Sequence, residues 1–148
     1  NDGTFYHRLD GITYDVFKRF EERFSAVRWR FANTRAVGGT PMSDGIQFAL
    51  AALSARNEAH RFLFVVTDGQ PDYVHDKVIN RQVRIAKEAG IHIVGVGLGS
   101  GSGCVKELFP DHVWSEDIAE IPRLLVKKLN DLVDIRGTRA GCRIKRTG

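Results

Sequence analysis

The feature that most constrains this chain is an apolar segment that ends at an acidic residue. Five apolar residues in a row, Phe62–Val66, predict a β-strand that is buried on both faces, as in the middle of a parallel sheet. Asp68 and Gly69 then predict a turn, and Pro71 prevents the strand from continuing. Open α/β sheets bind their ligands at the carboxyl ends of the strands, so Asp68 is a candidate binding residue. The alternative is that Asp68 only caps the turn or the next helix.

Two helices are expected before this strand. Apolar residues recur at helical spacing over Ile12–Val27, which predicts an amphipathic helix with one buried stripe. The alternation of polar and aromatic residues over Arg28–Phe31 fits either a short edge strand or an ordered loop. Thr40 is a suitable N-cap and Pro41 suits the first position of a second helix, which is expected to end near Arg56.

Helices and strands alternate after Asp72. A helix is predicted over Asp76–Glu88, ending at Gly90, and a second buried strand over Ile91–Val96. The glycine-rich residues 97–103 predict a flexible loop. The other expected elements are a helical turn at Val105–Phe109, a short strand at Val113–Trp114 and, after a cap at Asp117, a long helix to about Val133 whose buried side is formed by Ile118, Ile121, Leu124, Leu125, Leu129 and Leu132.

This order of elements predicts an α/β fold with a Rossmann-like, doubly wound, mostly parallel sheet and helices on both faces. Only three strands are evident, whereas such sheets usually have about five or six, so we expect the first strand or strands to be missing from the chain. Residues 1–134 are expected to form one partial domain. Residues 135–148, which are rich in Arg and Lys, are expected to form a flexible basic tail.

The composition excludes several function classes. No apolar run of the 148 residues approaches the ~20 residues of a membrane span. The spacing of Cys104 and Cys142 does not match a metal site, and two cysteines are too few for a disulfide framework. This cysteine usage favours a reducing, cytoplasmic location. The five histidines are scattered, which argues against zinc. The glycines after Val96 match no dinucleotide motif, and no P-loop lysine or nucleophile at a strand-to-helix elbow occurs.

Two loops remain as the candidate site. The Thr40 hydroxyl and the Asp68 carboxylate are hard oxygen ligands of the kind that Mg²⁺ prefers. The segment Gly38–Pro41 with the helix after it, and the strand ending in Thr67–Pro71, resemble the second and third segments of the metal-ion-dependent adhesion site (MIDAS) of von Willebrand factor A (vWA) domains. The resemblance covers residues 12–134. Among subgroups it is greatest to the intracellular bacterial type that includes the carboxyl-terminal domain of the cobaltochelatase subunit CobT.

This resemblance implies a non-catalytic, metal-ion-dependent protein–protein interaction module. Thr40 and Asp68 would hold a divalent ion, expected to be Mg²⁺, and Gly39, Gly69 and Gln70 would shape the loops around it. A protein partner would complete the site with a carboxylate. In the cobaltochelatase relatives of cobalamin biosynthesis, such a domain belongs to an assembly with an AAA+ ATPase.

The chain departs from the family in one respect. The Asp-x-Ser-x-Ser segment that gives the metal an acid and two serines does not occur in the sequence. Asp44 lies within the start of the expected helix and is a poor substitute. We therefore expect metal binding by this chain to be weak or absent. The strand edge left by a missing strand also predicts self-association or pairing with a second polypeptide.

Two other functions stay open. Asp68 and Asp72 at the end of a strand could bind Mg²⁺ for phosphoryl transfer, although neither a nucleophile nor a phosphate cradle accompanies them. The basic tail could bind nucleic acid, although the aromatic residues lie far upstream of it, so a solvated terminus is the simpler interpretation.

Overall fold

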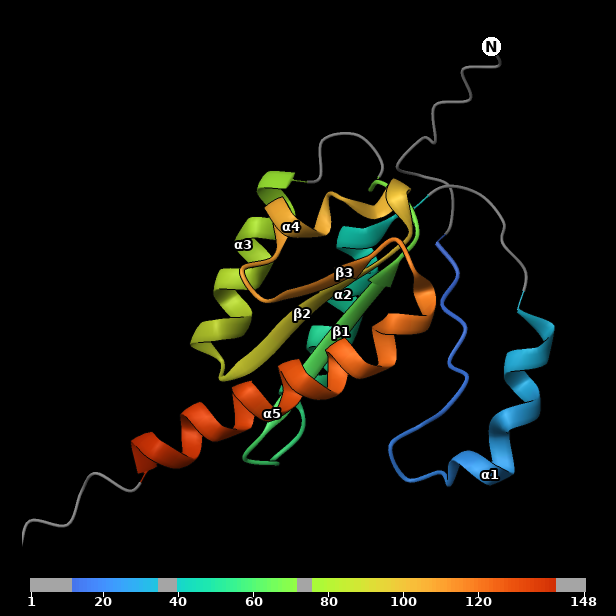
Figure 1. Cartoon of the computed structure of the whole chain (residues 1–148). Helices are drawn as coiled ribbons and strands as arrows, with labels where there is room; N and C mark the ends of the chain where they lie inside the picture. Colours follow the sequence, from blue (N-terminus) through green and yellow to red (C-terminus); the bar gives the residue numbers. More distant parts are fainter. Residues whose placement is uncertain (1–11, 35–39, 72–75, 141–148) are drawn as a thin grey trace, which may run out of the picture.

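The structure is a computed structural model of the chain, and it describes residues 12–34, 40–71 and 76–140. Within these residues lies a parallel sheet of three strands in the order β1-β2-β3, which confirms the predicted α/β fold (Figure 1). The strands are β1 (Arg61–Thr67), β2 (Ile91–Leu98) and β3 (His112–Ser115). The helices are α1 (Phe24–Val27), α2 (Met42–Ser54), α3 (Asp76–Glu88), α4 (Val105–Leu108) and α5 (Ile121–Ala140), with 3-10 turns η1 (Arg28–Asn33), η2 (Ser100–Ser102) and η3 (Ile118–Glu120).

β2 is the middle strand, and it is buried on both faces. Its side chains alternate between two cores because successive residues of a strand point to opposite faces. Ile91 and Ile93 join a core with α2, α3 and α4, whereas Val94 and Val96 join a second core with α5. The helices therefore cover both faces of the sheet, with α2 and α3 on one side and α5 on the other (Figure 1).

β1 lies at an edge of the sheet, so the prediction that it is buried on both faces is wrong. Among the described strands it pairs only with β2. Leu63 packs on the α2 side and Phe64 on the α5 side, but both are only half-buried, and Val66 is 57% exposed. The reason is that α5 packs mainly against β3 and leaves the end of β1 uncovered. The expected self-association of the chain stays a prediction.

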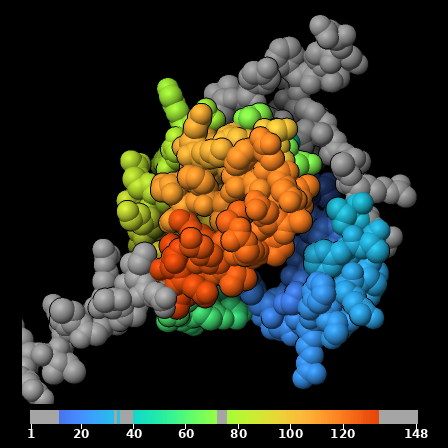
Figure 2. Space-filling view, viewed as in Figure 1, coloured from blue at the N-terminus to red at the C-terminus, as the bar shows by residue number. Residues whose placement is uncertain are grey.

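The predicted amphipathic helix over Ile12–Val27 is also wrong. Only its last four residues are α-helical, and η1, rather than an edge strand or a loop, follows them. Four of the six residues assigned to the buried stripe are exposed, namely Ile12, Val16, Phe20 and Phe24. A helix in a protein depends on tertiary burial of its apolar face. The segment 12–34 lies at the side of the molecule, away from the two cores, so that burial is missing (Figure 2).

Individual side-chain contacts attach this segment instead. Tyr14 stacks on Phe48 of α2 with 4.4 Å between the ring centroids. The Arg56 guanidinium lies 4.8 Å from the centroid of the Phe20 ring. Two such side-chain contacts bury less apolar surface than a packed helix face would, so many apolar side chains of this segment stay exposed.

The later elements agree closely with the prediction. The helix predicted over Asp76–Glu88 is confirmed with these bounds, and Gly90 after it has φ 72°, a left-handed conformation that glycine adopts without strain. Asp117 does act as a cap, but it caps η3, and Ile118 is 60% exposed rather than buried. The backbone of α5 continues to Ala140, beyond the end near Val133 that was predicted for this helix, and the flexible basic tail expected over residues 135–148 stays a prediction. Residues 141–148 lie outside the described part.

The closest packing in the sheet is between β2 and the residue after α4. Phe109 is fully buried, and its ring lies against the backbone of Gly95. A Cβ atom on Gly95 would lie 2.3 Å from Cδ2 of Phe109. Glycine is therefore required at this position, since any larger residue would displace the ring.

This contact predicts the effect of one added methyl group. We expect Gly95→Ala to lower the free energy of unfolding by about 1–3 kcal/mol, the usual cost of overpacking a core. The control is Gly103→Ala, because a Cβ atom there meets nothing within 4 Å. Urea denaturation of both variants measures the difference. Equal stability of the two variants would show that Phe109 moves aside without cost.

Candidate functional site

Of the residues singled out in the sequence, the described ones, Thr40 and Asp68–Gln70, lie at one end of the sheet. A cavity of about 410 Å³ separates the first turns of α2 from β1. Thr40 and Pro41 line it from the α2 side, and Val66 and Thr67 line it from the end of β1. The structure therefore places Thr40 and Pro41 next to the carboxyl end of β1, where the turn Thr67–Gly69 begins.

Thr67 holds the turn that contains Asp68. Its side chain is buried, and its Oγ1 donates to the Gly69 carbonyl at 3.0 Å and accepts from the Gly69 N–H at 3.3 Å. This local ring of hydrogen bonds leaves Asp68 exposed at the tip of the turn. Sequence reasoning assigned no role to Thr67, although a threonine two residues before a turn glycine is the signal for such a motif.

The loop after β2 supports this turn from the other side. Gln70 Nε2 donates to the Gly101 carbonyl at 3.2 Å, and Cys104 Sγ contacts the Gly69 carbonyl at 3.5 Å. A Cβ atom on Gly101 would lie 2.9 Å from the main-chain oxygen of Asp68. Gln70 and Gly69 thus attach the β1 loop to the β2 loop.

The glycine-rich residues 97–103 are ordered, so the prediction of a flexible loop is wrong. The strand continues to Leu98, and η2 follows. The Gly99 carbonyl accepts from Ser102 Oγ at 2.8 Å and from Trp114 Nε1 at 3.1 Å. Glycine is needed here for close packing, since a Cβ atom on Gly97 would lie 2.7 Å from Ser102 Oγ. Sequence periodicity contains no information on such side-chain contacts.

The start of α2 differs from the prediction by one residue. Pro41 occupies the N-cap position and Met42 begins the helix, while the Thr40 carbonyl accepts from the Met42 N–H at 2.7 Å. Asp44 lies in the first turn of α2, as expected, where an acidic residue suits the helix dipole. The buried Ser43 carbonyl accepts from Gln82 Nε2 at 2.8 Å, which attaches α2 to α3 beside the site.

The described residues fit a divalent cation in the type of ligand but not in number. Thr40 and Asp68 offer oxygen, whereas Mg²⁺ takes about six oxygen ligands including water. Over residues 12–34, 40–71 and 76–140, no three His, Cys, Asp or Glu side chains cluster closely enough to hold a metal. Gly39 and Asp72 lie outside the described residues, so their part in a cation site is inferred from the sequence alone. Two such oxygen ligands among the described residues are too few to hold a cation by themselves.

The Cys104 thiol contacts the turn, and its environment does not activate it. Burial raises the pKa of the Cys104 thiol, and the negative charges of Asp76 and Glu107 raise this pKa further. The thiolate is the nucleophilic form of cysteine. The Cys104 side chain therefore acts as a packing group at this end of the sheet.

The raised pKa predicts slow alkylation. In a Cys142→Ser variant, Cys104 is the only thiol of the chain. We expect iodoacetamide to modify the folded variant more slowly than the urea-unfolded variant near neutral pH. The midpoint of the rate against pH should also be higher for the folded protein, because the proton is held to higher pH. Mass spectrometry follows the reaction, and a lower midpoint in the folded protein would contradict the assignment.

Comparison with known proteins identifies the family. The model of the von Willebrand factor type A domain matches residues 14–131, which include all three strands together with α2 and α3. No curated protein matches the chain. In the part of the chain that the structure describes, no helix is both long and apolar enough to span a bilayer. The parallel sheet with helices on both faces agrees with this match, and the chain belongs to the von Willebrand factor type A domain family.

Proposed function

We propose that this chain is a metal-ion-dependent protein–protein interaction module whose docking site is the Asp68 turn. Domains of this family are generally interaction modules and typically bind a divalent metal at an adhesion site. The observation that carries the proposal is that Asp68 is exposed at the tip of a turn fixed by Thr67, Gln70 and Cys104, beside the Thr40 loop. A rigid, exposed carboxylate of this kind suits binding of a cation.

Thr40 and Asp68 are the residues that we propose to hold the ion. A carboxylate of a partner protein can bind to a divalent ion at this position and so complete the site. Gly69 and Gln70 keep the turn in place through their contacts with Cys104 and Gly101. Because these two ligands are too few for tight binding, a partner or further oxygen ligands must supply the rest.

The partner class that we propose is an AAA+ ATPase. Its support is the sequence resemblance of Gly38–Pro41 and Thr67–Pro71 to the intracellular bacterial vWA domains that work with such ATPases. A binding role also agrees with the environment of Asp68. Among the described residues, the thiol that contacts this turn is Cys104, whose raised pKa makes it a poor nucleophile.

The role of Asp68 predicts where a paramagnetic cation binds. Mn²⁺ also takes oxygen ligands and broadens NMR signals of nearby amides. We expect titration with Mn²⁺ to broaden the amide signals of Thr40, Gly69 and Gln70 before others, and Asp68→Asn to remove this effect. The matched control is Glu88→Gln, which removes an exposed carboxylate from the end of α3, away from both cavities. With Mg²⁺, calorimetry should show weak binding or none.

Two outcomes would contradict this assignment. Broadening that survives in Asp68→Asn would place the ion elsewhere. Tight binding of Mg²⁺ by residues 1–148 alone would show that the chain holds more ligands than Thr40 and Asp68.

The proposed function also predicts metal-dependent capture of a protein. The immobilised chain should retain a partner from a lysate in Mg²⁺ and release it in EDTA. Asp68→Asn should retain at least about tenfold less, which corresponds to the loss of roughly 1.4 kcal/mol of binding free energy. Glu88→Gln should behave as the unmodified chain. Retention that is the same in EDTA, or the same for Asp68→Asn, would refute metal-dependent docking at this turn.

A further inference from the structure

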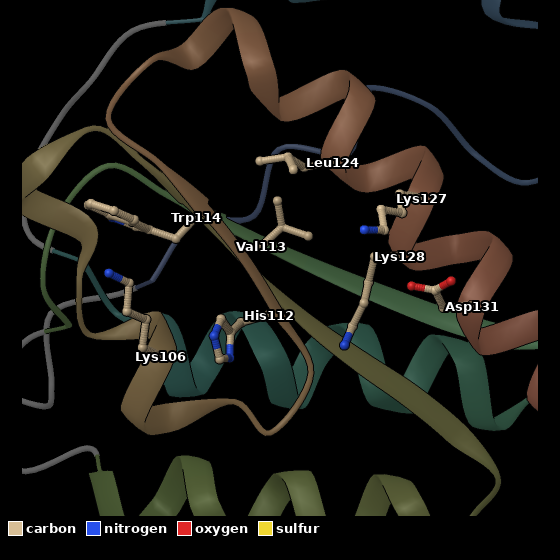
Figure 3. Close-up of a pocket in the computed structure, with 8 residues that line it drawn as sticks. All are labelled: Lys106, His112, Val113, Trp114, Leu124, Lys127, Lys128 and Asp131. Carbon is tan, nitrogen blue, oxygen red and sulfur yellow. The ribbon is translucent and has the colours of Figure 1, made fainter.

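A second surface lies at the other edge of the sheet, along β3. A cavity of about 310 Å³ opens there between β3 and α5 (Figure 3). We call this cavity the β3 groove. Its polar lining consists of Lys106, His112 and Trp114 together with Lys127, Lys128 and Asp131. β3 is the last strand in the sheet order, so its outer edge pairs with no other strand among the described residues.

The backbone of β3 presents hydrogen-bonding groups to this groove. The Gly95 N–H donates to the Asp111 carbonyl at 2.9 Å, and the Gly99 N–H donates to the Ser115 carbonyl at 3.0 Å. In a parallel ladder, alternate residues of a strand bond to the same neighbour. The N–H and C=O groups of His112 and of Trp114 therefore point away from β2, toward the open edge. An extended segment can pair with such groups by adding a strand.

Both faces of β3 contribute side chains to the groove. On the α4 side, Lys106 Nζ lies 3.4 Å from the centroid of the Trp114 ring. On the α5 side, Val113 and Leu124 form an apolar floor (Figure 3). Successive side chains of an added strand would point to opposite faces, so they would meet these two sides in turn.

The charge of the groove selects the kind of strand. Its lining contains three lysines and one aspartate. Lys128 is neutralised by Asp111, with 2.7 Å between Nζ and Oδ1, whereas Lys106 and Lys127 take part in no ion pair with another described residue. Lysines along an open edge oppose pairing with an apolar or basic strand. They attract an acidic one.

We propose that the β3 groove binds an extended acidic peptide segment of a partner protein. The segment adds to the outer edge of β3 as a further strand, and its carboxylates lie next to Lys106 on one face and Lys127 on the other. This interaction uses no metal ion and is separate from the Asp68 turn, which lies at the end of the opposite edge strand. It therefore goes beyond the function proposed above.

Tryptophan fluorescence tests this proposal directly. Trp29 is 63% exposed, and in a Trp29→Phe variant the only tryptophan is Trp114 in the groove. The probe is a blocked eight-residue peptide with the sequence Thr-Glu-Val-Glu-Glu-Val-Glu-Thr. We expect saturable quenching or a shift of Trp114 emission, unchanged by EDTA and weakened by salt. Lys127→Glu should weaken binding about tenfold, because a favourable charge contact becomes a repulsion.

Two controls separate strand addition from simple charge attraction. Lys87→Glu makes the same change on the exposed surface of α3, across the sheet from α5, and should leave binding unchanged. The same peptide N-methylated at alternate residues keeps its charge but cannot form the ladder, and it should bind at least about tenfold more weakly. Asp68→Asn should have no effect, which distinguishes this surface from the Asp68 turn.

Several results would overturn the proposal. Equal binding of the N-methylated peptide would show that the groove only attracts charge. Equal weakening by Lys87→Glu and Lys127→Glu would show a general effect of net charge. Displacement of the peptide by inorganic phosphate or by single-stranded oligothymidine at matched charge concentration would identify an anion site or a nucleic-acid site in place of a peptide site.

Discussion

Burial of β2 on both faces is the constraint on which the rest of this structure depends. A parallel strand in that position needs helices above and below it, and it needs a neighbour on each side for its backbone groups. The chain meets the first need with α2, α3 and α4 on one face and α5 on the other. It meets the second with β1 and β3. The glycines of β2 follow from the same constraint, since Gly95 and Gly97 admit the ring of Phe109 and the side chain of Ser102 against the strand.

The candidate metal site is a consequence of where these strands end. The turn after β1 and the loop after β2 lie at the same edge of the sheet, where Gln70 and Cys104 connect them. Thr67 holds the turn from within, and Ser102 and Trp114 hold the loop through the Gly99 carbonyl. Together the turn and the loop hold Asp68 in an exposed position, in a domain of a family whose members typically bind metal at such loops.

The two edges of the sheet differ in character. Beside β1 lies a cavity lined mostly by apolar residues of α2 and β1, and Val66 there is exposed. Beside β3 the lining is rich in lysine, and the edge is short. Lysines at an edge discourage indiscriminate strand pairing, whereas an apolar edge does not. The β1 edge therefore suits an apolar partner, and the β3 edge suits the acidic segment proposed above.

The sequence by itself determined the elements whose apolar pattern is strong and local. The strands at Phe62–Val66 and Ile91–Val96, the helix Asp76–Glu88 and the parallel α/β arrangement could all be predicted, since period and length distinguish a strand from an amphipathic helix, although the second strand extends two residues further, to Leu98. The motif around Asp68 could also be recognised, because its residues are consecutive.

The tertiary structure decided which apolar segments pack against a core and which stay exposed. Residues 12–27 have a helical pattern but lie away from both cores, and β1 has the composition of a central strand but stands at an edge. It also decided that the glycine-rich loop is ordered, because Trp114 of β3 donates a hydrogen bond to the Gly99 carbonyl, in addition to the bond from Ser102 within the loop. Burial and hydrogen bonding between segments far apart in the chain cannot be read from the local pattern of either segment.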